Sequence, residues 1–340
     1  MNARSIHRPC PVCGSATAEP HWQKGDLRLV RCGECGMIYA NPIPADMASG
    51  AFYDAAGKDY YLSPAKLESD YAEVRFEREL RLFRKHCPRG FVLDVGCSSG
   101  AFLFQLKKGW PGDYEILGTD VSGPPLDYAE SRGVPVMRGD FLQMGVEKTS
   151  AATSPEAPPS VPLPVRRGAG DQGPEAGFDA ITFWAVAEHL AEPKRFLEQA
   201  HALLKSGGLC FVLVPNFRSL AVRLLGARYR YVYEQHLNYF TAQTLTALVT
   251  PKFELLETRF THFNPVVIWQ DWRDNGREVS NAERGALLKR TTAYKQKGWM
   301  KPAKWAYRAT ENALAAFGLA DNVVVVLKKR SLPPTERGSF

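Results

Sequence analysis

The chain has 340 residues, 45% apolar and 23% charged, a composition that excludes a wholly disordered chain. Its long apolar runs, such as Leu209–Val214 and Val323–Leu327, are far shorter than the roughly 18 residues of a membrane span, which excludes a membrane-spanning chain. The N-terminal residues have no apolar signal core, so we expect a cytoplasmic protein and exclude a secreted disulfide scaffold. The net charge of +7 is concentrated between residues 284 and 308, and the rest of the chain is nearly neutral, so the overall charge is poor evidence for a nucleic-acid partner.

Residues 1–42 carry two Cys-x-x-Cys pairs, which we predict to be the ligands of a zinc ribbon: Cys10, Cys13, Cys32 and Cys35. Each pair can place two thiolates on one tight turn, and two such turns complete a tetrahedral site that suits Zn²⁺. Four thiolates leave the metal no open position for water, so we expect a structural ion. A redox dithiol is the alternative, but it normally uses one pair beside a βαβ unit.

Residues 43–88 are predicted to be a helical linker or lid. Pro64 begins an amphipathic helix that continues to about His86, with Phe76, Leu80 and Phe83 at helical spacing. We expect this apolar stripe to pack over the larger domain that starts at residue 89.

A buried strand, a glycine turn and a helix follow, and they predict a cofactor site. The strand is Phe91–Val95, and Gly96 and Gly100 allow a ligand to approach the backbone at the helix N-terminus, where free N–H groups face an anion. A second strand, Tyr114–Thr119, ends in Asp120, whose carboxylate can accept both hydroxyls of a ribose.

Three kinds of site use a strand, a glycine turn and a helix of this kind. A dinucleotide fingerprint needs G-x-G-x-x-G, which is not present. The residues Gly96–Gly100 match a G-x-S-x-G nucleophile elbow with Ser98 as its serine, but an elbow normally follows several strands. Only an S-adenosylmethionine site uses Asp94, the two glycines and Asp120 together, and we favour it.

With these motifs the sequence resembles the class I S-adenosylmethionine-dependent methyltransferases over most of residues 89–265. The resemblance implies an α/β, Rossmann-like sheet of seven strands, the last antiparallel, within a core of residues 89–269. Ser98 stands where the family often has a glycine. The positions that contact the donor in the family correspond here to Asp94, Gly96, Cys97, Gly100, Asp120, Val121, Asp140, Phe141 and Trp184.

The second half of the core carries a finer resemblance. Phe178–Trp184 followed by Glu188-His189-Leu190 looks like the family's fourth strand and motif, although Ala185 stands where relatives often have Asp. The segment His236–Thr241 is similar to the ubiquinone-type O-methyltransferase branch, whose pattern many zinc-ribbon methyltransferases share. Between strands three and four, residues 144–177 have no aromatic residue and are rich in proline and glycine, so we expect a disordered insertion.

Residues 270–318 are predicted to be a basic helical insertion, followed by a closing strand at 319–330 and a frayed tail at 331–340. Ser280-x-x-Glu283 is a capping box that begins one helix. The segment is either a dock for an acidic substrate, a nucleic acid or a membrane surface, or an ordinary solvated face. Its basic residues, without an intervening acid, are Arg284, Lys289, Arg290, Lys295, Lys297, Lys301, Lys304 and Arg308.

Methyl transfer from a sulfonium is an in-line displacement, so alignment and exclusion of water matter most, and a base helps when the acceptor is a hydroxyl or a carbon acid. His189 lies just past the fourth strand, where open α/β sheets bind ligands, and is the candidate base; the alternatives are a part of the cofactor wall or a helix cap. His236 is the second catalytic candidate, and Tyr233, His236 and Tyr239 are expected to contact the substrate.

The favoured function is therefore methyl transfer to a small molecule, at a hydroxyl oxygen before a carbon or nitrogen. One alternative is an RNA methyltransferase that binds through the ribbon and the basic helices, although a nucleic-acid partner is not favoured. The other is a non-catalytic scaffold that binds the cofactor. The acceptor and the oligomeric state have no signal in the sequence.

Overall fold

The computed structural model describes residues 5–145, 177–249, 252–277, 279–280, 283–287, 289 and 301–330. The insertion expected at 144–177, apart from its end residues, the tail at 331–340 and residues 278, 281–282, 288 and 290–300 of the basic segment lie outside these residues. Among the described helices, none has both the length and the apolar character needed to cross a membrane.

A seven-stranded sheet forms the centre of the molecule, in the order β12-β13-β10-β9-β6-β7-β8. The strands from β8 to β10 pair in parallel, whereas β13 is antiparallel to both of its neighbours. This confirms the expected Rossmann-like sheet with an antiparallel last strand. The strands are β6 (Gly90–Val95), β7 (Tyr114–Asp120), β8 (Val136–Arg138), β9 (Phe178–Trp184), β10 (Leu204–Pro215), β12 (Phe253–Thr261) and β13 (Asn322–Lys329).

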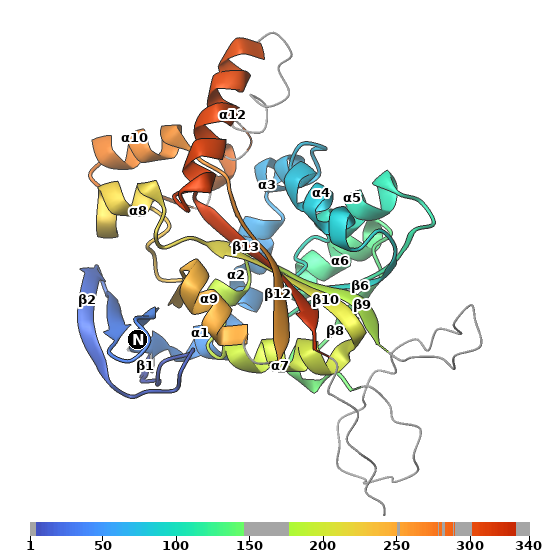
Figure 1. Ribbon diagram of the computed structural model, residues 1–340, viewed down its shortest axis with the longest axis horizontal. Helices are drawn as coiled ribbons and strands as arrows, with labels where there is room; N and C mark the ends of the chain where they lie inside the picture. The colour runs from blue at the N-terminus through green and yellow to red at the C-terminus, as the bar shows by residue number, and fades with distance from the viewer. Residues whose placement is uncertain are drawn as a thin grey trace, which may run out of the picture.

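Helices cover both faces of this sheet (Figure 1). The helices α4 (Glu77–His86), α5 (Ala101–Gly109) and α6 (Gly123–Ser131) pack on one face, and α7 (Pro193–Leu203) and α9 (Ala242–Val249) on the other. Successive residues of a strand point to opposite faces, so Val92 is in the apolar cluster under α4, α5 and α6, and Leu93 is in the cluster under α7 and α9. Burial on both faces explains why the central strands are continuous apolar runs.

The N-terminal segment forms a second sheet that the core completes. The strands β2 (Ala18–Lys24), β3 (Leu27–Cys32) and β4 (Ile38–Ala40) are joined by β11 (Asn238–Tyr239), which pairs antiparallel with β4. A short pair, β1 (Ser5–Ile6) and β5 (Ile43–Pro44), closes the segment. The sequence predicted a zinc ribbon at residues 1–42, and in the structure the sheet of this segment also contains a strand from the middle of the chain.

The side chain of Arg8 fastens the same junction. Its guanidinium donates to the carbonyl oxygens of Ala191 at 2.8 Å and Leu237 at 2.5 Å, and to Asn238 Oδ1 at 3.0 Å. Asn238 in turn donates to the carbonyls of Ala187 and Leu190. The ribbon is therefore tied to both chain segments that flank the predicted catalytic histidines.

The linker contains four helices, α1 (Ala45–Ser49), α2 (Ala51–Tyr61), α3 (Pro64–Asp70) and α4, so the single helix predicted from Pro64 to His86 is wrong. Helix α3 ends because tertiary contacts compete with further helical turns. The Gln105 side chain donates to the carbonyls of Asp70 and Ala72, and the Tyr71 hydroxyl donates to the Ser99 carbonyl at 2.5 Å. The chain then starts a new helix, whose Leu80 and Phe83 are buried as predicted.

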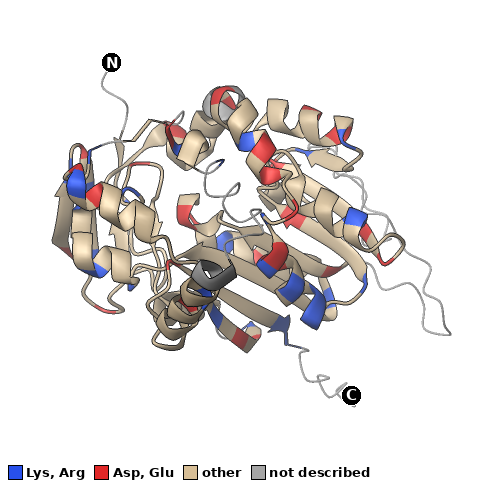
Figure 2. Cartoon of the chain, turned by 90° about the horizontal axis from the view of Figure 1, so that it is seen from above, with Lys and Arg blue, Asp and Glu red and all other residues tan. Residues whose placement is uncertain are grey.

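The C-terminal helical region begins earlier than residue 270, because α10 (Pro265–Arg273) starts at a proline, and the Asn264 side chain caps it by accepting from Val267 N–H. The predicted capping box forms, with Ser280 N donating to Glu283 Oε2 at 2.9 Å and Glu283 N to Ser280 Oγ at 3.3 Å. Residues 283–287 are helical, and α12 (Lys301–Ala316) precedes β13. Lysine, arginine, aspartate and glutamate are interspersed over the described chain (Figure 2).

Candidate active site

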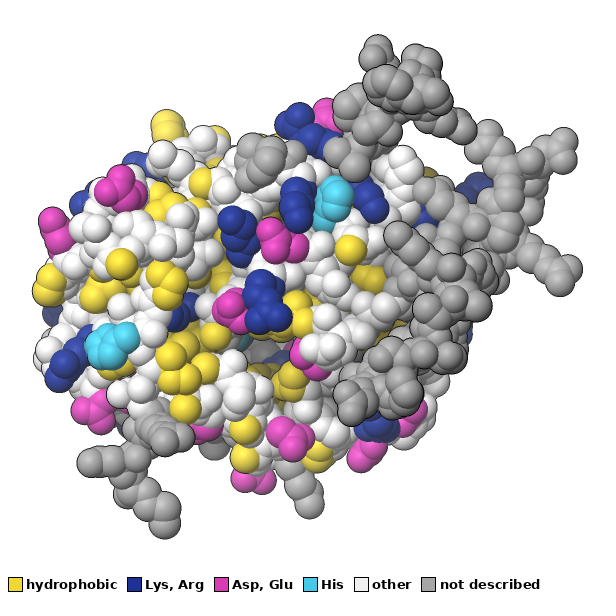
Figure 3. All heavy atoms as spheres, turned by 90° about the horizontal axis from the view of Figure 1, so that it is seen from below, with side chains coloured by type: hydrophobic (Ala, Val, Ile, Leu, Met, Phe, Trp, Pro, Cys, Tyr) yellow, Lys and Arg dark blue, Asp and Glu magenta, His cyan; other side chains and the backbone are white. Residues whose placement is uncertain are grey.

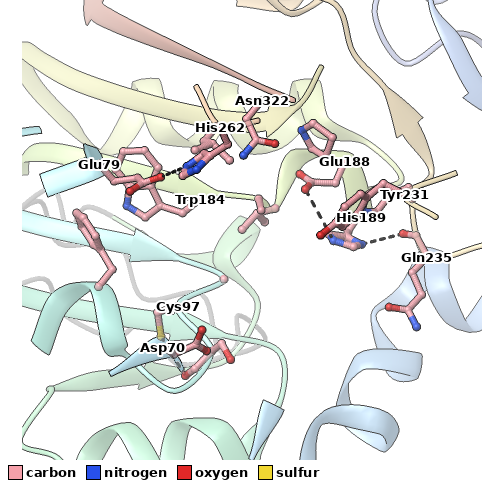
Figure 4. A pocket seen from close by; sticks show the side chains of 18 of the residues that line it. Asp70, Glu79, Cys97, Trp184, Glu188, His189, Tyr231, Gln235, His262 and Asn322 are labelled. Atoms are coloured by element: carbon pink, nitrogen blue, oxygen red, sulfur yellow. Dashed lines mark hydrogen bonds and ion pairs between the residues drawn. The ribbon is translucent and has the colours of Figure 1, made fainter. Parts of the chain in front are cut away.

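A cavity of about 1750 Å³ lies at the carboxyl ends of β6, β7, β9 and β10. This is the edge at which open α/β sheets bind ligands. Pockets for one small molecule have volumes of roughly 300–1,000 Å³, so this cavity has room for a methyl donor and an acceptor together. Apolar and charged side chains border a hollow in the molecular face of Figure 3, and Figure 4 shows the cavity wall from close by.

The glycine loop between β6 and α5 forms one wall, and two of its positions require glycine. Gly96 and Gly100 have φ of 70° and 74°. A Cβ on Gly96 would lie 2.6 Å from Val186 Cγ2, and one on Gly100 would lie 2.9 Å from Ala129 Cβ. Ser98 also has a positive φ, 50°, an angle that costs a non-glycine residue free energy. Its N–H donates to Asp120, which fixes the loop in this conformation.

Two carboxyl groups lie at the carboxyl ends of the first two strands, Asp94 buried and Asp120 half-buried. Asp94 accepts a hydrogen bond of 2.6 Å from Thr182 Oγ1, and burial raises its pKa to about 7. Asp120 accepts from the backbone N–H of Ser98 at 2.8 Å and of Ser122 at 3.0 Å, and burial raises its pKa too. Each Asp120 oxygen keeps a lone pair for another donor, so the carboxylate fits a ribose diol.

The remaining donor-site candidates differ in how they meet the cavity. Asp140 is exposed on the cavity wall, and Oδ1 accepts from Leu142 N at 2.9 Å. Phe141 is buried against Phe196, with 5.6 Å between ring centroids. Val121 stands 52% exposed at the rim.

Cys97 and Trp184 lie deeper in the same wall. The Cys97 thiol is buried over Gly118, where a Cβ would lie only 2.6 Å from Sγ. Its backbone is therefore the part suited to a ligand. Trp184 packs its ring against Phe102, with centroids 5.1 Å apart, and its buried Nε1 has no hydrogen-bond partner among the described residues.

His189 ends the short helix η2 (Ala187–His189) and faces the cavity from its other side. Its Nδ1 donates to the Gln235 carbonyl at 2.8 Å and lies 3.0 Å from the Tyr53 hydroxyl. Burial lowers its pKa to about 4, so the ring is neutral at neutral pH. With the proton on Nδ1, Nε2 is an unprotonated base.

Glu188 and His236 lie close to that nitrogen. Glu188 Oε1 is 4.0 Å from His189 Nε2, and the buried Glu188 Oε2 has no hydrogen-bond partner in the described part of the chain. Burial raises the pKa of this carboxyl to about 8. The rings of His189 and His236 are 4.8 Å apart, and burial holds the pKa of His236 well below its usual range. One ligand atom of each residue lies within 4.8 Å of the others, a geometry that can share a proton or hold a cation.

The predicted substrate residues do not all reach the cavity. Tyr233 and His236 line it, with ring centroids 4.4 Å apart. Tyr239 lies behind this wall in β11, where its hydroxyl donates to the Tyr233 carbonyl at 3.1 Å. Tyr239 is thus placed to support Tyr233.

Sequence reasoning missed several lining residues. Tyr53 and Tyr61 come from α2, a segment without a recognised motif, and Arg284 comes from the basic segment. Glu188 was noted only as part of a motif. His262, which the sequence did not single out, lines the cavity and pairs with Glu79 at 2.9 Å.

The four ribbon cysteines are brought together as predicted. Cys10 Sγ and Cys35 Sγ are 3.5 Å apart, as are Cys13 Sγ and Cys32 Sγ, and one sulfur of each cysteine lies within 4.8 Å of the others. Zn–S bonds of about 2.3 Å in a tetrahedron place sulfurs about 3.8 Å apart. This donor set therefore fits a zinc ion.

Comparison with known proteins agrees with this architecture. A family model described as a methyltransferase domain matches residues 69–250. The chain is 29% identical to the ubiquinone biosynthesis O-methyltransferase of Ruegeria pomeroyi over 205 residues, 56% of this chain and 73% of that protein. It is also 29% identical to the protein of that name from Dinoroseobacter shibae, over 67% of this chain and 87% of the relative.

Among solved structures, the chain aligns with a Thermotoga maritima S-adenosylmethionine-dependent methyltransferase that is described as a possible histamine N-methyltransferase. The TM-score is 0.48 and the identity 17%, and the alignment covers 84% of this chain and all of that one.

The family match covers more than half of the chain and includes the glycine loop, both strand-end carboxylates and His189. The chain therefore belongs to the methyltransferase-domain family and is an S-adenosylmethionine-dependent methyltransferase of class I.

Proposed function

We propose that the protein transfers a methyl group from S-adenosylmethionine to a hydroxyl oxygen of a small molecule. The observation that carries this proposal is the neutral His189, whose Nδ1 proton is held by Gln235 and whose Nε2 is free beside the cavity. A hydroxyl acceptor needs such a base, whereas an amine with a free lone pair does not. The ubiquinone O-methyltransferase relatives support the same chemistry.

The donor supplies an electrophilic methyl group on a sulfonium. We assign its methionine end to Asp94 and the loop of Gly96 and Gly100, its ribose to Asp120 and its adenine to the wall at Asp140. His189 Nε2 takes the proton of the acceptor hydroxyl as the oxygen–methyl bond forms and the methyl–sulfur bond breaks. The products are the methyl ether, the neutral thioether and a proton, which His189 releases to solvent. The linker tyrosines exclude water from the cavity.

Glu188 gives this reaction an expected pH dependence. Its carboxyl titrates at about pH 8, and above that pH its charge, 4.0 Å from His189 Nε2, favours the imidazolium and makes His189 a stronger base. We therefore expect kcat/KM to rise as the pH increases through about 8. Glu188→Gln should remove this rise, because an amide does not titrate. Initial rates from pH 6 to 9.5 for both proteins test the prediction, and the same rise in the variant would contradict it.

We also propose that Cys10, Cys13, Cys32 and Cys35 hold a structural Zn²⁺. The convergence of four thiols on two turns supports it. Metal analysis should find one zinc per chain, and Cys32→Ser should lose it and lower the melting temperature by roughly 10 °C or more. Ser15→Ala, in the same turn region, is the control and should keep the metal. If the wild-type protein without its metal melts at the same temperature as the untreated wild-type protein, the proposal is refuted.

Label transfer tests the function itself. The protein is incubated with S-adenosylmethionine labelled on the methyl group and with fractions of a cell extract. We expect label in a small-molecule fraction, in a product whose methyl group resists the mild acid and base that cleave methyl esters. Label in RNA would favour the nucleic-acid alternative. A lack of label in every fraction, with donor binding intact, would favour a non-catalytic scaffold.

The described part of the basic segment supports a small acceptor. Arg284 and Arg308 line the cavity, and Lys289 pairs with Glu68 at 2.7 Å. Two of these three cations, the half-buried Arg284 and the exposed Arg308, thus border the cavity where a small molecule would bind.

A further inference from the structure

Arg284 places a cation on the acceptor side of the cavity. The side chain is half-buried, and its Cζ lies 4.0 Å from the centroid of the Tyr233 ring. Tyr233 also packs against His236, the neighbour of His189. A positive charge is therefore held on the side of the cavity that carries Tyr233 and His236, where the acceptor is expected.

The described chain gives this cation no anionic partner. Its Nε donates to the Val279 carbonyl at 3.1 Å and one Nη donates to the Arg230 carbonyl at 3.4 Å, but no described carboxylate lies within 4.0 Å. Two nearby acids pair with other arginines, Asp271 with Arg230 and Glu283 with Arg277, each at 2.6 Å. Glu188 is protonated at neutral pH and does not neutralise the charge.

Contacts of the residues on both sides of Arg284 hold its backbone in place, and this fixes the position from which the side chain extends. The capping box of Ser280 and Glu283 caps the N-terminus of its helix. Gly285 packs onto α3, where a Cβ would lie 3.6 Å from Ala65 Cβ, and Lys289 pairs with Glu68 of the same helix. This short helix thus closes one wall of the cavity against the linker.

Hydroxyl groups surround the same space. Tyr60, Tyr61, Tyr231 and Tyr233 line the cavity, and none of their hydroxyls is used in a hydrogen bond among the described residues. Burial is the main reason why the pKa of each of them is raised, so each keeps its proton and can donate. A guanidinium with neighbouring O–H donors is the chemistry that recognises a carboxylate or a phosphate.

We infer that the methyl acceptor carries an anionic group, a carboxylate or a phosphate, that binds to Arg284 while its hydroxyl faces His189. This inference rests on the proposed function and names the class of its substrate. The pairing holds one end of the acceptor and so fixes the distance between the reacting hydroxyl and the base.

The test uses the full-length protein, S-adenosylmethionine labelled on the methyl group and the small-molecule fraction of a cell extract. The labelled product should be retained by an anion exchanger at pH 7. At limiting extract, Arg284→Gln should reduce the labelling about 10- to 100-fold, and a tenfold higher extract concentration should restore part of it, because binding is impaired more than chemistry. Arg284→Lys, which keeps the charge, should retain more labelling than the glutamine variant.

Arg273→Gln is the matched control, since Arg273 is an exposed arginine of α10 that pairs with Asp274 outside the cavity. It should label as the wild type does, and all variants should keep the wild-type melting temperature and donor affinity. Label in an uncharged product, or unchanged labelling by Arg284→Gln, would overturn the inference while leaving the proposed function intact. A wild-type protein that labels nothing would refute the proposed function, and the inference with it.

Discussion

Asp120→Asn is expected to weaken the binding of S-adenosylhomocysteine about 100-fold. The carboxylate would accept two hydrogen bonds from a ribose, and a bond to a charged acceptor contributes about 1.5–3 kcal/mol, so loss of the charge costs roughly 3 kcal/mol. The amide oxygen can still accept one of the backbone N–H groups that Asp120 now holds, so the loop should keep its fold. Isothermal titration measures the affinity, and the melting temperature reports on folding.

Asp127→Asn is the control for this change, because Asp127 lies on the neighbouring helix α6 with its side chain 72% exposed. Its affinity for S-adenosylhomocysteine should equal that of the wild type. If Asp120→Asn also binds S-adenosylhomocysteine with the wild-type affinity, the assignment of Asp120 to the ribose of the donor is wrong.

His189→Ala should lower kcat between about 10²- and 10⁴-fold with a hydroxyl acceptor, the usual contribution of a general base, while the affinity for S-adenosylhomocysteine stays within about twofold. The alanine variant keeps the fold of η2, whose backbone is tied through Asn238 and Arg8. Single-turnover label transfer measures the chemical step.

His201→Ala is its matched control, since His201 lies on α7 and does not line the cavity. It should react at the wild-type rate. If His189→Ala loses donor affinity and keeps its rate with bound donor, His189 is a wall of the donor site and the base must be another group.

The parts of the fold that the sequence predicted well depend on local signals. A buried strand followed by Gly96 and Gly100 can form only a narrow range of turns, and the structure has both glycines at positive φ. The two Cys-x-x-Cys pairs likewise define their own turns. In each case, residues within a dozen positions of one another determine the geometry.

The parts that it missed depend on contacts between distant residues. Nothing near Asn238 indicates that it pairs with Tyr39 in the ribbon sheet, because β11 is two residues long and has no pattern of its own. The break after α3 needs Gln105, 35 positions from Asp70. Arg284 belongs to a basic run, and its partner Tyr233 is about 50 positions away. Side chains that meet only after folding leave no periodic signal.

Because β4 and β11 pair in one sheet, the N-terminal segment cannot be replaced on its own by the same segment of another protein. A chimera with the ribbon of a relative would have to import the matching 238–239 strand, since the Arg8–Leu237 bond joins residues 229 positions apart. A truncated chain that starts after residue 42 would lose that guanidinium and expose the Tyr239 edge. A substitution on one side of the contact between the N-terminal segment and residues 237–239 is therefore expected to be tolerated when a substitution on the other side compensates for it.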